Sequence, residues 1–198
     1  MTPEQSILNQ LNISPRNVWE IGVGQPELCS SIAFIDLGVP VKLFEPFTPH
    51  YQRLNAVYGT KLNVEIYNVA ILDIDGAVNL CLANECSWIE GVKSPAVHSS
   101  ILTGSSLTNY PHDCVPGCRL SRFDYGQIDV LLVDTEGCEW KVISSMISRP
   151  KAIRLEMELG YPNKDQYRTP DEDKILEWLS RNGYRLAGRQ ADDSWFVK

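Results

Sequence analysis

The sequence contains no hydrophobic run long enough to cross a membrane, and its first residues lack the basic region and apolar core of a signal peptide. We therefore expect a cytoplasmic chain with no membrane partner. Without a secretory signal, the cysteines should be free thiols, and Cys29 and Cys81 should be small core residues because their surroundings are apolar. Cys114 and Cys118 have the spacing of half a zinc site, but no second half follows, so we expect no structural metal.

Positive charge is also scarce. The chain has 18 Lys and Arg against 25 Asp and Glu, a formal net charge of -7, and the basic residues are scattered. Such a surface repels a phosphate backbone, which argues against nucleic acid as a partner. The length of 198 residues fits one domain over residues 1–198 with a sizeable core. Whether the chain forms a homo-oligomer is left open by the sequence.

A glycine-containing turn stands out near the N-terminus. A short apolar run at residues 18–21 carries Glu20, and Gly22 and Gly24 follow it. Residues 27–35 then show helical spacing, with Pro26 at the place of a first helical turn. Strand, glycine turn and helix in this order are typical of a nucleotide-binding unit, in which the absent Cβ atoms let the backbone turn and a ligand approach.

An acid follows the second apolar run, at a distance of about 20 residues from the glycines. This run covers residues 40–44 and ends in Glu45. An acid at that position of a parallel sheet accepts hydrogen bonds from a ribose diol, which suggests an adenosine-containing cofactor. The third glycine of the dinucleotide fingerprint is missing, and a tight turn without a ligand is the alternative interpretation of these residues alone.

Strand and helix patterns alternate along the chain. We expect strands at residues 18–21, 41–44, 64–67, 77–82, 128–133 and 152–158, and helices at 5–11, 27–35, 50–58, 139–147 and 171–182. Within the helix at 139–147, Trp140, Ile143 and Ile147 should face inward. The alternation predicts an α/β fold with a doubly wound, mostly parallel sheet, which a terminal antiparallel hairpin at 184–187 and 194–197 closes.

Two segments fall outside this alternation. We expect residues 1–17 to form a cap packed on the sheet edge. Residues 83–117 have little periodicity. A long irregular stretch in a compact domain is usually disordered or functional. The aromatic and polar residues of the second segment favour a lid or substrate loop.

Ordered blocks of sequence complete the pattern. They are Glu20-Ile21-Gly22-Val23-Gly24, Phe44-Glu45-Pro46, Asn68-Val69-Ala70 with Asp73 and Gly76, and the apolar strand that ends in Asp134-Thr135-Glu136-Gly137-Cys138-Glu139. With these blocks the chain resembles the FkbM-type S-adenosylmethionine-dependent methyltransferases. The resemblance implies a Rossmann-like class I methyltransferase fold and, as the usual activity, O-methylation of a hydroxyl on a small molecule or glycan.

The resemblance also implies residues that hold the cofactor, S-adenosyl-L-methionine. Glu20, Gly22 and Gly24 should line its methionine and ribose side, with Glu20 accepting from the ammonium group directly or through water. Glu45, with Pro46 beside it, should hold the ribose diol. The adenine should lie between two further residues, where Asn68 contributes a side-chain hydrogen bond and Val69 contributes its backbone and an apolar contact. A turn-forming role is the alternative for Asn68.

The acceptor side should lie at the end of the central strand. Asp134, which also borders the cofactor, Glu136 and His98 are the candidate catalytic residues, because a carboxylate or an imidazole can take the proton of the acceptor hydroxyl. A divalent metal ion held by carboxylates is the alternative way to activate that hydroxyl. Glu136 has a further alternative, capping the helix that follows.

Three further residues are candidates for substrate binding. Trp88 offers an aromatic face to a ring or a sugar. Of Glu156 and Glu158, on the last parallel strand, we expect one to point toward the cleft.

Two other functions stay open at this point. One is a nicotinamide-dependent oxidoreductase on a similar sheet, against which the missing glycine and the terminal hairpin argue. The other is a non-catalytic cofactor-binding relative, suggested by Glu20 where the family usually has Asp and by Pro26 where it has glycine.

Overall fold

The structure is a computed structural model that describes residues 3–82, 87–92, 111–157, 171–190 and 193–198. Its main sheet has the strand order β10 (Arg185–Gln190), β11 (Asp193–Val197), β9 (Ala152–Glu156), β8 (Val130–Val133), β1 (Val18–Ile21), β2 (Val41–Phe44) and β3 (Val64–Tyr67). The neighbouring strands β9, β8, β1, β2 and β3 are parallel. At one edge, β11 and β10 form an antiparallel hairpin. The predicted doubly wound sheet with a terminal hairpin is confirmed.

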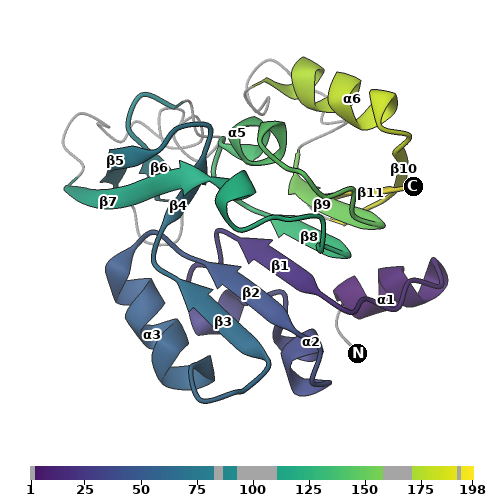
Figure 1. Cartoon of the computed structure of the whole chain (residues 1–198), viewed down its shortest axis with the longest axis horizontal. Coiled ribbons are helices and arrows are strands. Elements are labelled where there is room, and N and C mark those ends of the chain that lie inside the picture. The colour runs from purple at the N-terminus through teal and green to yellow at the C-terminus, as the bar shows by residue number, and fades with distance from the viewer. Residues whose placement is uncertain (1–2, 83–86, 93–110, 158–170, 191–192) are drawn as a thin grey trace.

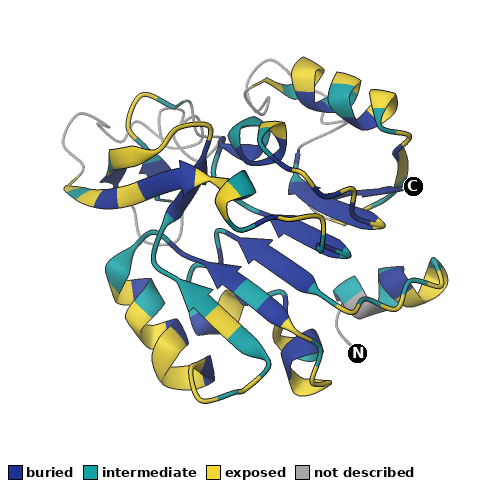
Figure 2. Cartoon of the chain, viewed as in Figure 1, coloured by how far each residue is buried: buried dark blue, intermediate teal, exposed yellow. Residues whose placement is uncertain are grey.

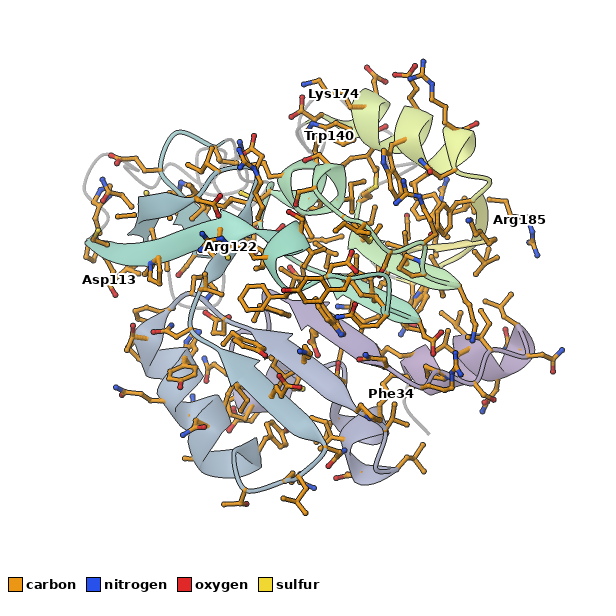
Figure 3. The ribbon with its side chains drawn as sticks, in the orientation of Figure 1. Phe34, Asp113, Arg122, Trp140, Lys174 and Arg185 are labelled. Carbon is orange, nitrogen blue, oxygen red and sulfur yellow. The ribbon has the colours of Figure 1, made fainter. Side chains whose placement is uncertain are left out.

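Helices cover both faces of this sheet (Figure 1). One face carries α1 (Pro3–Gln10), α2 (Ile32–Asp36) and α3 (Thr48–Tyr58), and the other carries α5 (Glu139–Ser144) and α6 (Glu172–Arg181). Phe34 of α2 and Trp140 of α5 accordingly pack in the two separate cores (Figure 3). This double cover explains why the central strands are apolar on both sides.

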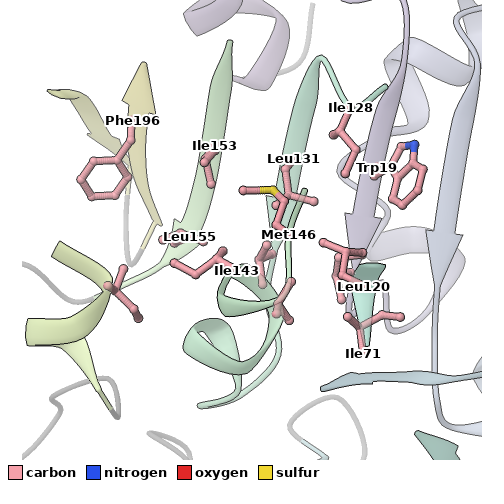
Figure 4. Close-up of a cluster of buried hydrophobic side chains, with 14 of the residues drawn as sticks. Trp19, Ile71, Leu120, Ile128, Leu131, Ile143, Met146, Ile153, Leu155 and Phe196 are labelled. Atoms are coloured by element: carbon pink, nitrogen blue, oxygen red, sulfur yellow. The ribbon is translucent and has the colours of Figure 1, made fainter. Parts of the chain in front are cut away.

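The core is deepest along β1, β8 and β9, which are almost wholly buried (Figure 2). On the α5 and α6 face, Leu131 and Ile153 from the sheet pack with Ile143 and Met146 (Figure 4). The residues between them in sequence point to the opposite face, as the twofold periodicity of a strand requires. Each Å² of apolar surface removed from water stabilises the fold by about 25 cal/mol. A slip of one residue would turn each side chain to the other face of its strand, so this burial fixes the register.

A second, smaller sheet stands beside the carboxyl ends of the main strands (Figure 1). Its order is β4 (Ala70–Leu72), β7 (His112–Arg119), β5 (Gly76–Cys81) and β6 (Trp88–Ile89). Arg119 ties β7 to the turn between β4 and β5, because its Nε donates to the carbonyl oxygen of Asp73 and its Nη1 donates to Asp75. This sheet forms a wall opposite the ends of β1, β2 and β8.

Three predicted segments are corrected by the structure. The helix expected at 27–35 is two pieces, the 3-10 turn η1 (Pro26–Leu28) and α2, because the amides of Ser30 and Ser31 donate to the Glu20 carboxylate instead of to helical carbonyls. The helix expected at 139–147 ends at Ser144, and Ile147 is 53% exposed rather than inward.

The third correction concerns the segment expected to be irregular, 83–117. Strand β6 and most of β7 lie inside it, and residues 112–117 of β7 pair with β5. Pro116 and Gly117 conceal this strand in the sequence, since both residues are unusual in strand interiors. Residues 93–110 of the segment lie outside the described part of the chain.

The buried positions of Cys29 and Cys81 confirm that both are core residues. Among the described residues no helix is long and apolar enough to cross a membrane.

Candidate active site

The glycine turn after β1 packs directly against the end of β8. Gly22 has φ +79°, and a Cβ at this position would come within 1.7 Å of the carbonyl oxygen of Asp134. Gly24 follows with φ +67°. Only glycine fits the first position, because an added methyl group would collide with backbone that cannot move away. The turn and Asp134 are therefore brought together by the fold itself.

Glu20 lies beneath this turn and is only 2% exposed. Its Oε1 accepts a hydrogen bond from the amide of Ser30, and its Oε2 accepts one from the amide of Ser31, both at 2.9 Å. Burial raises the pKa of the carboxyl, while the positive charge of Arg154 opposes that rise. Glu20 thus holds the chain after η1 in place, and its predicted contact with an ammonium group stays a prediction.

Glu45 connects the ends of the first two strands. It is 4% exposed, and its Oε2 accepts from the amide of Gly24 and its Oε1 from the amide of Phe47, each at 2.8 Å. Burial raises the pKa of this carboxyl to about 7, and hydrogen bonds from the backbone of Gly24, Phe47 and Val23 counteract part of that effect. A carboxylate offers about four acceptor sites, so Glu45 can also accept a hydrogen bond from a ligand.

Asn68 supports the segment around Glu45. Its Nδ2 donates to the carbonyl oxygens of Glu45 and Pro46, and its Oδ1 accepts from the hydroxyl of Thr48. Both ends of the amide are therefore bonded within the protein. This arrangement favours the turn-forming interpretation over the predicted hydrogen bond to adenine.

A cavity opens at the carboxyl ends of the strands, between the main sheet and the second sheet. It holds about 830 Å³ of space free of protein atoms, part of which is open solvent. Leu72 and Leu80 of the second sheet give it an apolar wall. Of the residues predicted from the sequence, it brings together Glu20, Gly22, Gly24, Glu45, Pro46, Val69, Trp88, Asp134 and Glu136.

Three carboxyl groups cluster beside the cavity. Oxygen atoms of Asp134, Glu136 and Glu156 lie within 4.8 Å of one another. Burial and the neighbouring carboxylates raise the pKa of Glu156 to about 10, so that it holds a proton at neutral pH and shares a hydrogen bond with Asp134. Such a shared proton explains the closeness of the groups as well as a metal ion would, so the cluster alone assigns no metal.

A fourth acid, Glu139, holds the loop that carries this cluster. Its Oε1 accepts from the amide and hydroxyl of Thr135 and from the amide of Gly137. Glu136 in this loop has φ +52°, a conformation that costs energy for a residue with a side chain. The loop is therefore capped by Glu139, and Glu136 is left at the cavity wall.

Sequence reasoning missed Arg154 and His50, which both line the cavity. Arg154 is 5% exposed, and His50 places its Nδ1 4.0 Å from Oε1 of Glu45. A charged residue inside the apolar run of β9 was the available signal for Arg154, since a buried arginine needs partners. No comparable signal marks His50. The candidates His98 and Glu158 lie outside the described residues.

Comparison with known proteins gives two kinds of match. The crystal structure of monomeric WbdD superimposes with a TM-score of 0.50 at 10% identity, covering 98% of this chain and 38% of that one. The chain thus spans little more than a third of that protein. The methyltransferase domain of bacterial CtHen1 matches with a TM-score of 0.48 at 12% identity, covering 98% of this chain and 95% of that one.

A search among curated proteins finds no match. The model of the methyltransferase FkbM domain matches residues 39–186, which include β2, Glu45, the acidic cluster and α6. The WbdD superposition supports the Rossmann-like fold. The chain belongs to the methyltransferase FkbM domain family.

Proposed function

We propose that the protein transfers a methyl group from S-adenosylmethionine to a hydroxyl group of a small molecule or a glycan. Family membership implies S-adenosylmethionine as the methyl donor. The observation that carries the proposal is the position of Glu45. Its buried carboxylate accepts a hydrogen bond from the amide of Gly24, and both residues line the cavity. Membership of this family argues against the nicotinamide-dependent alternative.

The residues around the cavity fit the nucleoside. Glu45 lines the cavity with a carboxyl whose oxygens are hydrogen-bond acceptors, the group that the hydroxyls of a ribose require. Val69, Leu72 and Leu80 supply apolar surface suited to a purine ring. Trp88 is 9% exposed at the same wall, where its ring could contact a bound ring or sugar.

The cofactor supplies a sulfonium-activated methyl group, and the protein has to orient the acceptor and take its proton. Glu156 is the least suited of the three to receive that proton, since burial and the neighbouring carboxylates raise its pKa and favour its protonated form. Asp134 and Glu136 remain as the carboxylates at the cavity wall. We assign the general base to one of these two.

Calorimetric titration with S-adenosylhomocysteine tests the proposal. We expect binding in the micromolar range and no binding of NADH. Incubation with methyl-labelled S-adenosylmethionine and a panel of hydroxyl compounds should then release S-adenosylhomocysteine. NADH binding without S-adenosylhomocysteine binding would reject the proposal, and cofactor binding without turnover on any acceptor would favour a non-catalytic relative.

A further inference from the structure

Arg154 is a charged residue in the middle of an apolar strand, and the proposed chemistry gives it no part. Both Glu20 and Arg154 are register neighbours of Leu132, so their side chains leave the same face of the sheet. The Arg154 side chain is almost completely buried, yet it lines the cavity. A guanidinium is retained in such a place only where partners compensate its lost hydration.

The described partners of Arg154 all contact one of its three nitrogens. Nη1 donates to Oγ of Ser30 at 2.8 Å and to Oε1 of Glu4 at 3.4 Å, and it lies 3.3 Å from Oδ2 of Asp193. The buried Nε has no hydrogen-bond partner among the described residues. Glu20 acts on Arg154 through its charge, because its own oxygens accept from the amides of the turn. Within the described part of the chain, the five donors of the guanidinium are thus only partly used.

Ser30 connects Arg154 with the Glu20 carboxylate. Its amide donates to Glu20 and its Oγ accepts from Arg154, so its hydroxyl proton is available to a ligand acceptor. Ser30 also lines the cavity. A hydroxyl donor and a guanidinium therefore lie side by side below the glycine turn, which is the donor set that binds a carboxylate.

The charges that line the cavity also favour a ligand carboxylate at Arg154. Its described lining contains the acids Glu20, Glu45, Asp134 and Glu136, and Arg154 is the permanently charged base among them. A free amino acid group entering this cavity carries one carboxylate, which the acids repel. We propose that Arg154, together with Ser30, binds the α-carboxylate of the methionine part of the cofactor. This assignment rests on the proposed function.

Two ligands separate this role from a structural one. S-adenosylhomocysteine carries the amino acid group, whereas 5′-methylthioadenosine shares the nucleoside and the sulfur but lacks it. Calorimetry with Arg154→Gln should show S-adenosylhomocysteine binding weakened by about 10-fold or more, as expected for loss of a charged hydrogen bond. Binding of 5′-methylthioadenosine should change by less than about threefold.

Glu4→Gln is the matched control, since it removes another partner of Nη1 and leaves the guanidinium in place. Its ratio of the two affinities should equal that of the wild type. An equal loss of both ligands in Arg154→Gln, or no loss of either, would overturn the assignment while leaving the proposed function intact. Failure of the wild type to bind S-adenosylhomocysteine would overturn both.

Loss of the contacts to Glu4 and Asp193 can also unfold the variant, so a second measurement uses the wild-type protein alone. Decarboxylated S-adenosylhomocysteine keeps the nucleoside, the sulfur and the ammonium. It should bind about 10-fold or more weakly than S-adenosylhomocysteine if a guanidinium holds the carboxylate. Equal affinity of the two compounds would contradict the assignment without any variant.

Discussion

At the scale of single residues, the proposed nucleoside site depends most on Glu45. Glu45→Gln keeps the size of the side chain but places an amide donor group where both Gly24 and a ribose hydroxyl need an acceptor. We expect S-adenosylhomocysteine to bind about 10-fold or more weakly, as for the loss of a charged acceptor. Calorimetry above pH 7 measures this, with Asp36→Asn at an exposed ion pair as the control. Unchanged affinity would remove Glu45 from the ligand site.

Glu139 gives a pH-dependent prediction that concerns stability. Burial raises its pKa from 4.5 to about 7, so this group stabilises the fold below pH 4.5 and loses that contribution as the pH rises through 7. The shift corresponds to about 3 kcal/mol. Glu139→Gln cannot titrate, and its oxygen can still accept from Thr135 and Gly137.

Urea unfolding of wild type and Glu139→Gln at pH 5 and pH 8 measures this contribution. The wild type should lose more stability between these pH values than the variant, by up to about 3 kcal/mol. Equal losses would show that Glu139 does not titrate in this window. Comparing the two proteins at each pH cancels the titration of Glu45, whose pKa is also raised, but by groups other than Glu139.

The position of a residue at the cavity was predictable only where a local pattern existed, and the roles of these residues stay predictions. Glu45 follows a strand at a distance that parallel sheets impose, and it does line the cavity. The use of both Glu20 oxygens by Ser30 and Ser31 could not be foreseen, since it depends on how the chain bends after η1. Arg154 was missed because its partners come from segments far away in the sequence.

At the scale of elements, the turn between β1 and η1 is the most demanding connection. Gly22 and Gly38 both have a positive φ, at +79° and +76°, but only Gly22 faces backbone within 4 Å. Gly22→Ala and Gly38→Ala therefore share the conformational cost, and only the first meets Asp134. We expect Gly22→Ala to lose about 1–3 kcal/mol more unfolding free energy than Gly38→Ala.

Urea unfolding and S-adenosylhomocysteine calorimetry test this pair of variants. Gly38→Ala should bind the ligand like the wild type, whereas Gly22→Ala should bind it more weakly because the turn has to shift. Similar behaviour of the two variants would mean that the packing of Gly22 on the end of β8 is unimportant.

The strands of the main sheet were predictable because burial on both faces makes them short and apolar, as in the run that becomes β8. Elements that depend on distant polar contacts were not. The end of α5 is one case, since the carboxylate of Asp124 accepts from the amides of Ile147 and Ser148 and draws the chain out of the helix. Strand β7 is another, since Pro116 and Gly117 interrupt the expected alternation.

At the scale of the whole molecule, the formal net charge of -7 bears on the kind of partner. Binding to nucleic acid is driven largely by Lys and Arg side chains that replace the counterions of the phosphates. A surface with this net charge therefore binds a polyanion weakly. We expect no retardation of single- or double-stranded RNA or DNA in a gel at low salt and micromolar protein. Salt-sensitive retardation would contradict a small-molecule or glycan acceptor.

The main sheet and the second sheet enclose one cavity at strand ends that are far apart in sequence, and we propose that this cavity is the nucleoside site. A crystal structure of the complex with S-adenosylhomocysteine tests this directly. We predict the ribose hydroxyls on Glu45, the purine at the wall formed by the second sheet, and the sulfur on the side of Asp134. A nucleoside bound elsewhere, with the Glu45 carboxylate touching protein atoms alone, would contradict the account.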